Sequence, residues 1–394
     1  MVFKDSNKCY LVLFRFSSLR RHQEVHGIPF IVNSFGYTSC CQSAAKIVSF
    51  SVVGAKKLLF FHRNACGMGK RLYFCSDKSR LLPEDQRTRR DIFFVKTMRY
   101  SKQAMTLVQQ IETLRRRGLI IDNEAEAIQA LDTISYFRLA DYWYSMEIDH
   151  YTHVFRDDSH FNEVLCCYYF DKELKVLIFK AIQTIEVAVR SKVIKHIAPI
   201  CGPFWFMDET MANNRIRFEQ NLETIRKEVG RSRERYIREH FRKYTEPDLP
   251  PVWKTLEVVS LGVLSKLYNN FSVSELKHHV ARDFGLNHHR FLASWLESLT
   301  ALRNHCAHHA RVWNRAYPVK PATPEVMPET WITDFSFPDE SLYPQLCCIA
   351  YWLRAIDPKS GFVADLKSLL FRYPTVDVAA MGFPKGWQQE PLWQ

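Results

Sequence analysis

The sequence predicts an all-α protein, built as a helical bundle with additional helices. From about residue 103 to the C-terminus, apolar residues recur at spacings of three and four, which is the period of an amphipathic helix. The alternating pattern that indicates strands is sparse. Hydrophobic residues make up 47% of the 394 residues, so the chain can bury a sizeable core and its composition is not that of a disordered protein.

Residues 1–97 do not share this helical pattern. They mix short apolar runs with Cys, Ser and basic residues, and no period persists. This segment holds 17 Lys and Arg against 6 Asp and Glu, a net charge of +11, whereas the rest of the chain holds 37 and 36, a net of +1. The overall charge of +12 therefore indicates contact with RNA only through this segment.

Two interpretations of the atypical basic segment stay open. In the first, it is not part of the native protein, which then starts at Met98 or Met105. In the second, it is a small accessory module that contacts RNA. In both, residues 98–394 form the main helical domain.

Within this domain, caps, glycines and prolines mark where helices start and stop. In the first half we expect a helix from about 103 that Gly118 stops, a helix capped by Asp122, an aromatic-rich segment at 134–144, and a long helix that Asp158 and Ser159 open and Gly202 and Pro203 close. The long helix should bury one stripe: Leu174, Leu177, Ile178, Ala181, Ile185, Ala188 and Val189. In the second half we expect charged helices in 212–244, a break at 247–251, helices at about 253–270, 274–284 and 288–315, a Pro-rich loop at 318–338, and closing helices at 341–356 and 361–372.

Cysteine usage and hydropathy indicate the compartment. None of the 11 cysteines forms a C-x-x-C pair, which argues against zinc knuckles and redox motifs. The pairs Cys166-Cys167 and Cys347-Cys348 lie in helical patterns and are expected to be buried thiols in a reducing cytoplasm. No run of ~18 apolar residues predicts a membrane span, and Arg15 and Arg20 interrupt the N-terminal apolar run too early for a clean signal peptide.

The helix expected around residues 291–315 carries the candidate chemistry. At ~100° per residue, its core stripe is Trp295, Leu299, Leu302, Cys306, Ala310 and Trp313. Asn304, His308, Arg311 and Arg315 project together from the side away from this stripe, and Arg303 lies between the two. No Asp or Glu occurs from Arg303 to Arg315, so this face predicts an anion site.

Metal-free RNA cleavage needs these residue types. A 2′-hydroxyl must lose a proton, the leaving 5′-oxygen must gain one, and the negative charge that develops on the phosphorus oxygens must be stabilised. Histidine titrates near neutrality and can transfer the proton, while arginine can hold the charge. One helix supplies one such set and cleavage works best with two, so we expect a two-fold dimer.

A family resemblance rests on these residues. Arg303-Asn304-x3-His308 resembles the R-x4–6-H signature of the HEPN superfamily, and the string Leu302 to Arg315 resembles the Abi-like (AbiD/AbiF) abortive-infection family. Further blocks that resemble the family occur in order over about 100–394: Leu114-x3-Gly118-Leu119 with Ile134 to Trp143, Ile185-Glu186-x3-Arg190, Pro250-Pro251-x-Trp253-x3-Glu257-x3-Leu261-Gly262, and Met381-Gly382-Phe383-Pro384-x2-Trp387.

The resemblance implies a HEPN-fold endoribonuclease of a phage-defence or toxin–antitoxin type. Arg303 and His308 would be its catalytic pair and Asn304 the residue that orients them, with no metal or other cofactor required. It further implies a homodimer that acts on RNA, with a noncoding RNA or an antitoxin as a further partner and no membrane association.

The other candidates each have two interpretations. His309 is expected to be a packed, hydrogen-bonded histidine, with an R-x5-H role in reserve. Arg311 and Arg315 either contact RNA phosphate or favour the helix C-terminus through its dipole. Cys306 lies on the core stripe, which argues against a nucleophile.

Glu186 and Arg190 stand at i, i+4, the spacing of a helix ion pair. We expect a buried structural pair, with positioning of Arg303 as the alternative, and we interpret Glu257 in the same way. The doublets His278-His279 and His288-His289 are not expected to bind metal, because adjacent residues on a helix diverge by ~100°.

A non-catalytic RNA-binding module that holds a noncoding RNA is the second functional class. It would use the same basic face without cutting RNA. A DNA-directed or metal-dependent nuclease is a third, and the absence of a helical carboxylate cluster argues against it.

Overall fold

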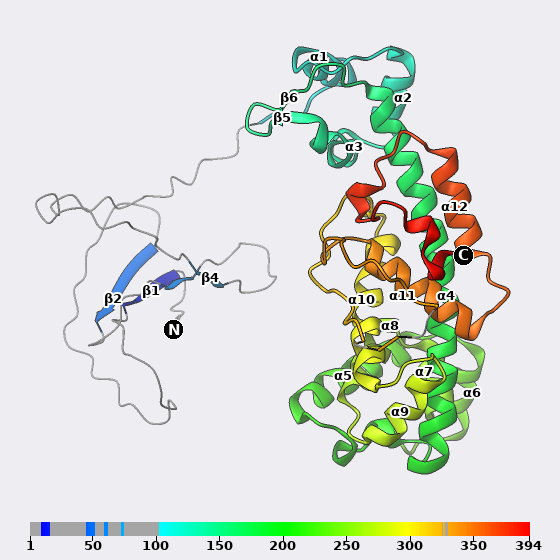
Figure 1. Cartoon of the computed structure of the whole chain (residues 1–394). Coiled ribbons are helices and arrows are strands. Elements are labelled where there is room, and N and C mark those ends of the chain that lie inside the picture. The colour runs from blue at the N-terminus through cyan, green and yellow to red at the C-terminus, as the bar shows by residue number, and fades with distance from the viewer. Residues whose placement is uncertain are drawn as a thin grey trace, which may run out of the picture. The chain divides into compact units, whose positions relative to one another are not determined.

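The computed structural model describes residues 102–324, 326–327 and 330–394, together with four short strands nearer the N-terminus (Figure 1). The chain divides into two units, Met1–Tyr100 and Ser101–Gln394, and each is described by itself. In the first unit, β1 (Cys9–Arg15) pairs in parallel with β2 (Ala45–Ser51), and β3 (Leu59–Phe61) pairs with β4 (Leu72–Phe74) in antiparallel register. The rest of that unit, and with it the role expected for residues 1–97, lies outside the described residues.

The second unit is helical, which confirms the predicted all-α class. Its helices are α1 (Leu107–Arg116), α2 (Glu124–Thr133), α3 (Tyr136–Trp143), α4 (Phe161–Cys201), α5 (Arg215–Arg231), α6 (Arg235–Lys243), α7 (Val252–Val258), α8 (Leu261–Asn270), α9 (Ser274–Arg282), α10 (His289–Ala307), α11 (Tyr343–Ile356) and α12 (Phe362–Arg372). Its two strands form one small hairpin, β5 (Glu147–Asp149) and β6 (Val154–Phe155). No helix of the described residues is long and apolar enough to cross a membrane.

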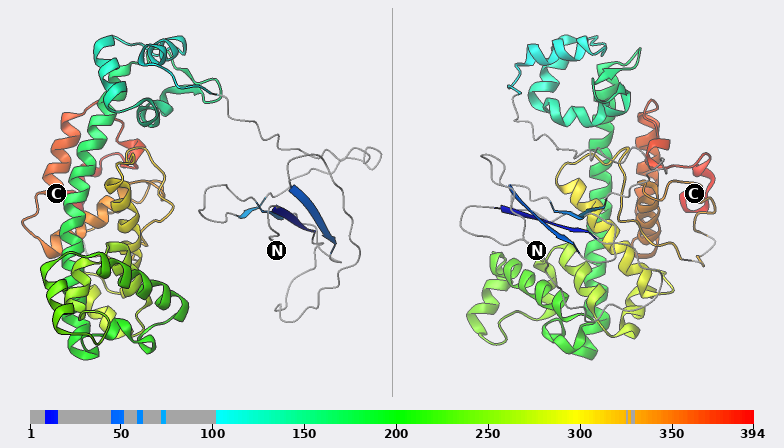
Figure 2. Two further views of the ribbon diagram at one scale, coloured as in Figure 1. Left: turned by 180° about the vertical axis from the view of Figure 1, so that it is seen from behind. Right: turned by 90° about the vertical axis from the view of Figure 1, so that its left-hand side faces the viewer.

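The long helix α4 organises this unit. At 1.5 Å per residue its 41 residues extend about 60 Å. Helices α1 to α3 lie at one end of α4 and α5 to α9 at the other, while α10, α11 and α12 lie along it (Figures 1 and 2). Of the predicted stripe, five members are buried and Leu177 and Ala188 are half-buried. The helix ends at Gly202, whose φ of 86° suits glycine and confirms the predicted stop.

Local capping explains the first helices. Thr106 and Gln109 form a reciprocal capping box at the start of α1, and Gly118 follows its end with a φ of 96°. The cap predicted for α2 was wrong by one residue. Asn123 accepts the backbone N–H of Glu126 at 3.2 Å, whereas Asp122 contacts His160, 2.8 Å away.

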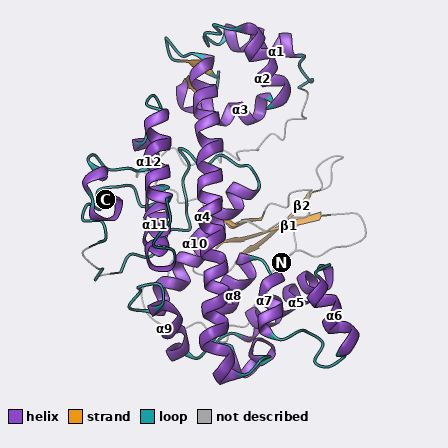
Figure 3. Cartoon of the chain, turned by 90° about the vertical axis from the view of Figure 1, so that its right-hand side faces the viewer, coloured by secondary structure: helices purple, strands orange, loops and turns teal. Residues whose placement is uncertain are grey.

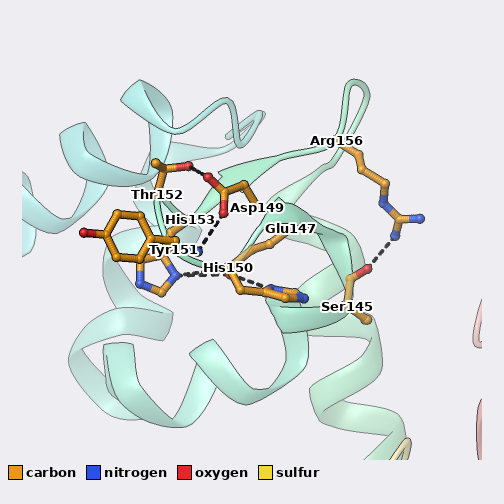
Figure 4. A network of polar contacts seen from close by, with 8 residues as sticks. All are labelled: Ser145, Glu147, Asp149, His150, Tyr151, Thr152, His153 and Arg156. Carbon is orange, nitrogen blue, oxygen red and sulfur yellow. Dashed lines mark hydrogen bonds and ion pairs between the residues drawn. The ribbon is translucent and has the colours of Figure 1, made fainter. Parts of the chain in front are cut away.

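The β5–β6 hairpin closes the end of the unit that α1 to α3 occupy. Glu147 is buried beneath it, and its carboxylate lies 3.1 Å from Nδ1 of both His150 and His153 (Figure 4). The N–H of Phe155 donates to the carbonyl of Arg117 at 2.9 Å, which ties the hairpin to α1.

The single helix expected at 253–270 is divided into α7 and α8. Val259 is extended, with a ψ of 151°, and its carbonyl accepts a hydrogen bond from Arg190 at 2.8 Å. The carboxylate of Glu228 accepts the N–H and the hydroxyl of Ser260. Tertiary side chains thus hold the backbone at this break, and a helical period does not reveal them.

Candidate functional site

The helix that carries the candidate residues ends earlier than predicted. α10 stops at Ala307, so the expected helix to residue 315 was wrong. The N–H of His309 donates to the carbonyl of Cys306 at 3.1 Å, and that of Ala310 donates to the carbonyl of His305 at 2.9 Å. These two bonds are those of a Schellman motif, which satisfies the last carbonyls of a helix and reverses the chain.

The residue that makes this turn is His309, whose φ is 56°. Glycine usually occupies this left-handed position, because a side chain there costs roughly 1–2 kcal/mol. Without a glycine, the sequence showed no sign of a stop. His309 itself is exposed, and its carbonyl accepts a hydrogen bond from Arg138 of α3 at 2.5 Å. The expectation of a packed histidine was therefore wrong: the bonded group is its backbone.

Arg303 and Asn304 lie on the last turn of α10, and His308 is the C-cap of that helix. Nη1 of Arg303 lies 3.4 Å from Oδ1 of Asn304, and the backbone N–H of His308 donates to the carbonyl of Asn304 at 3.0 Å. Both Asn304 and His308 are exposed, while Arg303 is half-buried. The side chains of Arg303 and Asn304 are thus in contact, and the His308 side chain is exposed at the same helix end.

Helix α4 contacts the side chain of Arg303. The guanidinium of Arg303 lies over the ring of Phe179, 5.8 Å from its centroid. Its Nε is buried without a hydrogen-bond partner, and among the described residues no carboxylate forms an ion pair with it. The guanidinium is held in place while its charge is left for an anion. Figure 3 shows α10 beside α4 and α11.

The loop after α10 is fixed by a buried carboxylate, that of Asp171 on α4. Oδ1 accepts the backbone N–H groups of Val312 and Trp313 at 2.9 and 2.6 Å. Oδ2 accepts the Tyr142 hydroxyl at 2.7 Å and pairs with Lys175 at 2.9 Å. Asp171 has no exposed surface, so these four donors replace the water that it loses. This anchor was not predicted from the sequence, although an Asp four residues before a Lys inside an apolar helix was a signal for it.

The last two arginines lie beyond the helix. Both Arg311 and Arg315 are half-buried in the loop, and Nη1 of Arg315 donates to the carbonyl of Arg311 at 3.4 Å. Both residues follow the last residue of α10, but the charge of Arg315 acts on His305 in the last turn, so an influence on the helix end through its dipole stays a prediction as well. Contact with RNA phosphate stays a prediction for this pair.

The supporting residues do not reach the site. Glu186 and Arg190 form a largely buried ion pair at 2.5 Å, and Arg190 also binds the carbonyl of Val259, so the pair holds the α7–α8 break. Among the described residues no hydrogen bond joins either of them to Arg303. Glu257 is exposed, so the expectation of a buried pair there was wrong.

Two neighbours on α10 serve its packing. Cys306 is buried, which raises the pKa of its thiol to about 12 and keeps it protonated at neutral pH. Nδ1 of His305 donates to the carbonyl of Ala301 at 2.7 Å, and burial lowers the pKa of this ring. Unlike His305, both His308 and His309 are exposed at the end of α10.

These contacts define the class of protein: an all-α protein whose candidate site is an exposed helix end that carries histidine and arginine without a carboxylate. The model of the family described as Abi-like protein matches residues 129–314, which include α3 to α10 and most of the turn after α10. Residues 129–314 are therefore assigned to the Abi-like family, which supports a role in abortive infection. Comparisons with curated proteins and with solved structures found no match.

Proposed function

We propose that the protein is a metal-independent endoribonuclease of a phage-defence or toxin–antitoxin type that acts in the cytoplasm. Arg303 and His308 are its catalytic pair, and Asn304 orients them. The observation that carries the proposal is that the end of α10 carries an exposed histidine and, five residues earlier, a half-buried arginine without an ion-pair partner among the described residues. The assignment of residues 129–314 to the Abi-like family supports the same biological setting.

Each side chain has a role that its position allows. His308 transfers the proton, either from the attacking 2′-hydroxyl or to the leaving 5′-oxygen. Arg303 stabilises the charge on the phosphorus oxygens, and the Phe179 ring holds its guanidinium in position beforehand. The loop arginines Arg311 and Arg315, with His309 beside them, bind neighbouring phosphates of the RNA.

A second copy of the chain completes the site. One turn carries one exposed catalytic imidazole, whereas general acid and general base are separate tasks. On α4, the exposed Tyr169, Val176 and Val187 fall within about 20° of one another around the helix, and the exposed Lys180 lies on the same side. These exposed apolar side chains support a two-fold interface along α4, which would bring two α10 ends together.

The test is cleavage of tRNA and mRNA by the purified protein with EDTA present. We expect the wild type to cut RNA and His308→Ala and Arg303→Ala to be inactive but folded, because His308 is exposed and Arg303 is not part of the core. Glu112→Ala removes an exposed side chain of α1 that is not a candidate site residue, and it serves as the control that keeps activity. Retained cleavage by the double variant would reject the proposal.

The same assay separates the second functional class. RNA that binds tightly to the wild type and stays intact would identify a module that holds a noncoding RNA. The positive charge of Arg303, Arg311 and Arg315 fits that outcome as well.

A further inference from the structure

Three histidines gather at the other end of α10. His278 lies on α9, His288 is the residue that caps α10, and His289 is the first residue of that helix. One ligand atom from each ring lies within 4.8 Å of the others, and the ring centroids are 4.5 to 4.7 Å apart. Metal binding was not expected from the sequence because His288 and His289, if both helical, would diverge by ~100°. His288 is extended instead, with a φ of −145°, so the two rings converge.

The hydrogen bonds of the cluster leave coordinating nitrogens available. Nδ1 of His278 lies 2.8 Å from the carbonyl of Ser274, which can only accept, so Nδ1 carries the proton and Nε2 has a free lone pair. Metal-binding histidines typically donate their other ring N–H to a carbonyl in this way. Nδ1 of His289 is buried and has no hydrogen-bond partner, which is unfavourable unless something binds there.

The third ring has to rearrange. Nδ1 of His288 accepts the backbone N–H of Arg290 at 3.1 Å, so its neutral ring carries the proton on Nε2. Coordination through Nε2 moves this proton to Nδ1 and gives up the capping bond. The site is therefore nearly formed rather than rigid.

We propose that His278, His288 and His289 bind one divalent ion of the zinc class, with water in the fourth position. Ligand atoms around tetrahedral zinc are about 3.3 Å apart for Zn–N of about 2.0–2.1 Å, so small side-chain rotations close the site. The donor set has no carboxylate oxygen, which disfavours Mg²⁺ and Ca²⁺ and favours ions that prefer imidazole.

The ion joins α9 to the start of α10 and takes no part in the proposed RNA chemistry. His289 and Arg303 are 14 residues apart on one helix, about 21 Å along its axis. Because the ion binds only the folded arrangement, it stabilises the α9–α10 junction.

The experiment is a titration of the metal-free full-length chain with Zn²⁺, followed by calorimetry and by thermal unfolding. His278→Ala removes a ligand, and His288→Ser removes a ligand but keeps an oxygen that can cap α10. His279→Ala is the matched control, because its ring contacts His196 rather than the cluster. We expect both ligand variants to lose one bound equivalent and the Zn²⁺-dependent rise in Tm, and His279→Ala to keep both.

Titration with Co²⁺ distinguishes imidazole from cysteine ligands, because thiolates give an intense charge-transfer absorption. The wild type should bind one Co²⁺ ion that the ligand variants do not bind, and we expect this ion to show no charge-transfer band from a thiolate. We expect Mg²⁺ to leave the Tm unchanged. Equal stoichiometry in the wild type and both ligand variants would overturn the proposal, as would a thiolate band on the lost equivalent or an equal Tm rise with Mg²⁺.

Discussion

Replacing Asp171 with asparagine is expected to destabilise the protein and to loosen the turn that carries the candidate site. Asparagine can keep the Oδ1 bonds to the N–H groups of Val312 and Trp313, but it removes the negative charge that faces Lys175. The Lys175 side chain is only 10% exposed, so its ammonium is left buried without a counter-ion. Breaking one partner of a buried pair costs 3–5 kcal/mol, and because two bonds survive we expect about 3 kcal/mol.

A double-mutant cycle isolates the pair. Lys175→Met removes the ammonium and leaves Asp171 with its bonds to Tyr142, Val312 and Trp313, so it should cost about 1–2 kcal/mol. In that background Asp171→Asn should cost only about 1 kcal/mol, because no charge is stranded.

Urea unfolding at neutral pH measures the four free energies, and hydrogen exchange at the Val312 and Trp313 amides reports on the turn. We expect both amides to exchange faster in Asp171→Asn. The reasoning is refuted if Asp171→Asn costs the same with and without Lys175, or if both amides keep their protection.

Three further changes test other parts of the molecule. Arg303→Lys keeps the charge but loses the planar fork, so single-turnover RNA cleavage should fall about 100-fold, and an unchanged rate would remove Arg303 from the chemistry. His309→Gly relieves the positive φ and should raise the free energy of unfolding by about 1 kcal/mol, with Gly118→Ala as the opposite control; a loss of cleavage would give His309 a role of its own. Burial alone would raise the pKa of Asp283, but hydrogen bonds from His196, Lys192 and Lys195 hold this pKa well below its usual range. A carboxyl group whose pKa is depressed in the folded state stabilises the protein above its unfolded pKa of about 4, and this stability is lost as the pH falls through the folded pKa. Asp283→Asn should therefore make the free energy of unfolding fall less steeply as the pH is lowered into the acid range. An unchanged dependence on pH would contradict this.

Much of the fold follows from local pattern. The bounds of α4 and the loop before α11 were predictable because apolar spacing, Gly202 and the prolines act over a few residues. The division between α7 and α8 was not, because it depends on Arg190 and Glu228, which are distant in the sequence.

The candidate site was predictable in its residue types and only partly in its geometry. The exposed Asn304 and His308 and the buried Cys306 follow from helical spacing, which holds as far as Ala307. After Ala307, the position of Arg311 depends on the left-handed conformation of His309 and on the hydrogen bonds of Asp171. Neither feature can be predicted from the spacing of apolar residues.

Helix α10 has one end against α9 and the other beside Arg138 of α3. A helix resists compression along its axis, so a shift of α9 against α4 is passed to the exposed turn with little loss. We therefore expect a ligand that shifts the α9–α10 junction to impair the RNA cleavage proposed for this turn, about 20 Å away along the helix, without competing for the proposed RNA-binding surface.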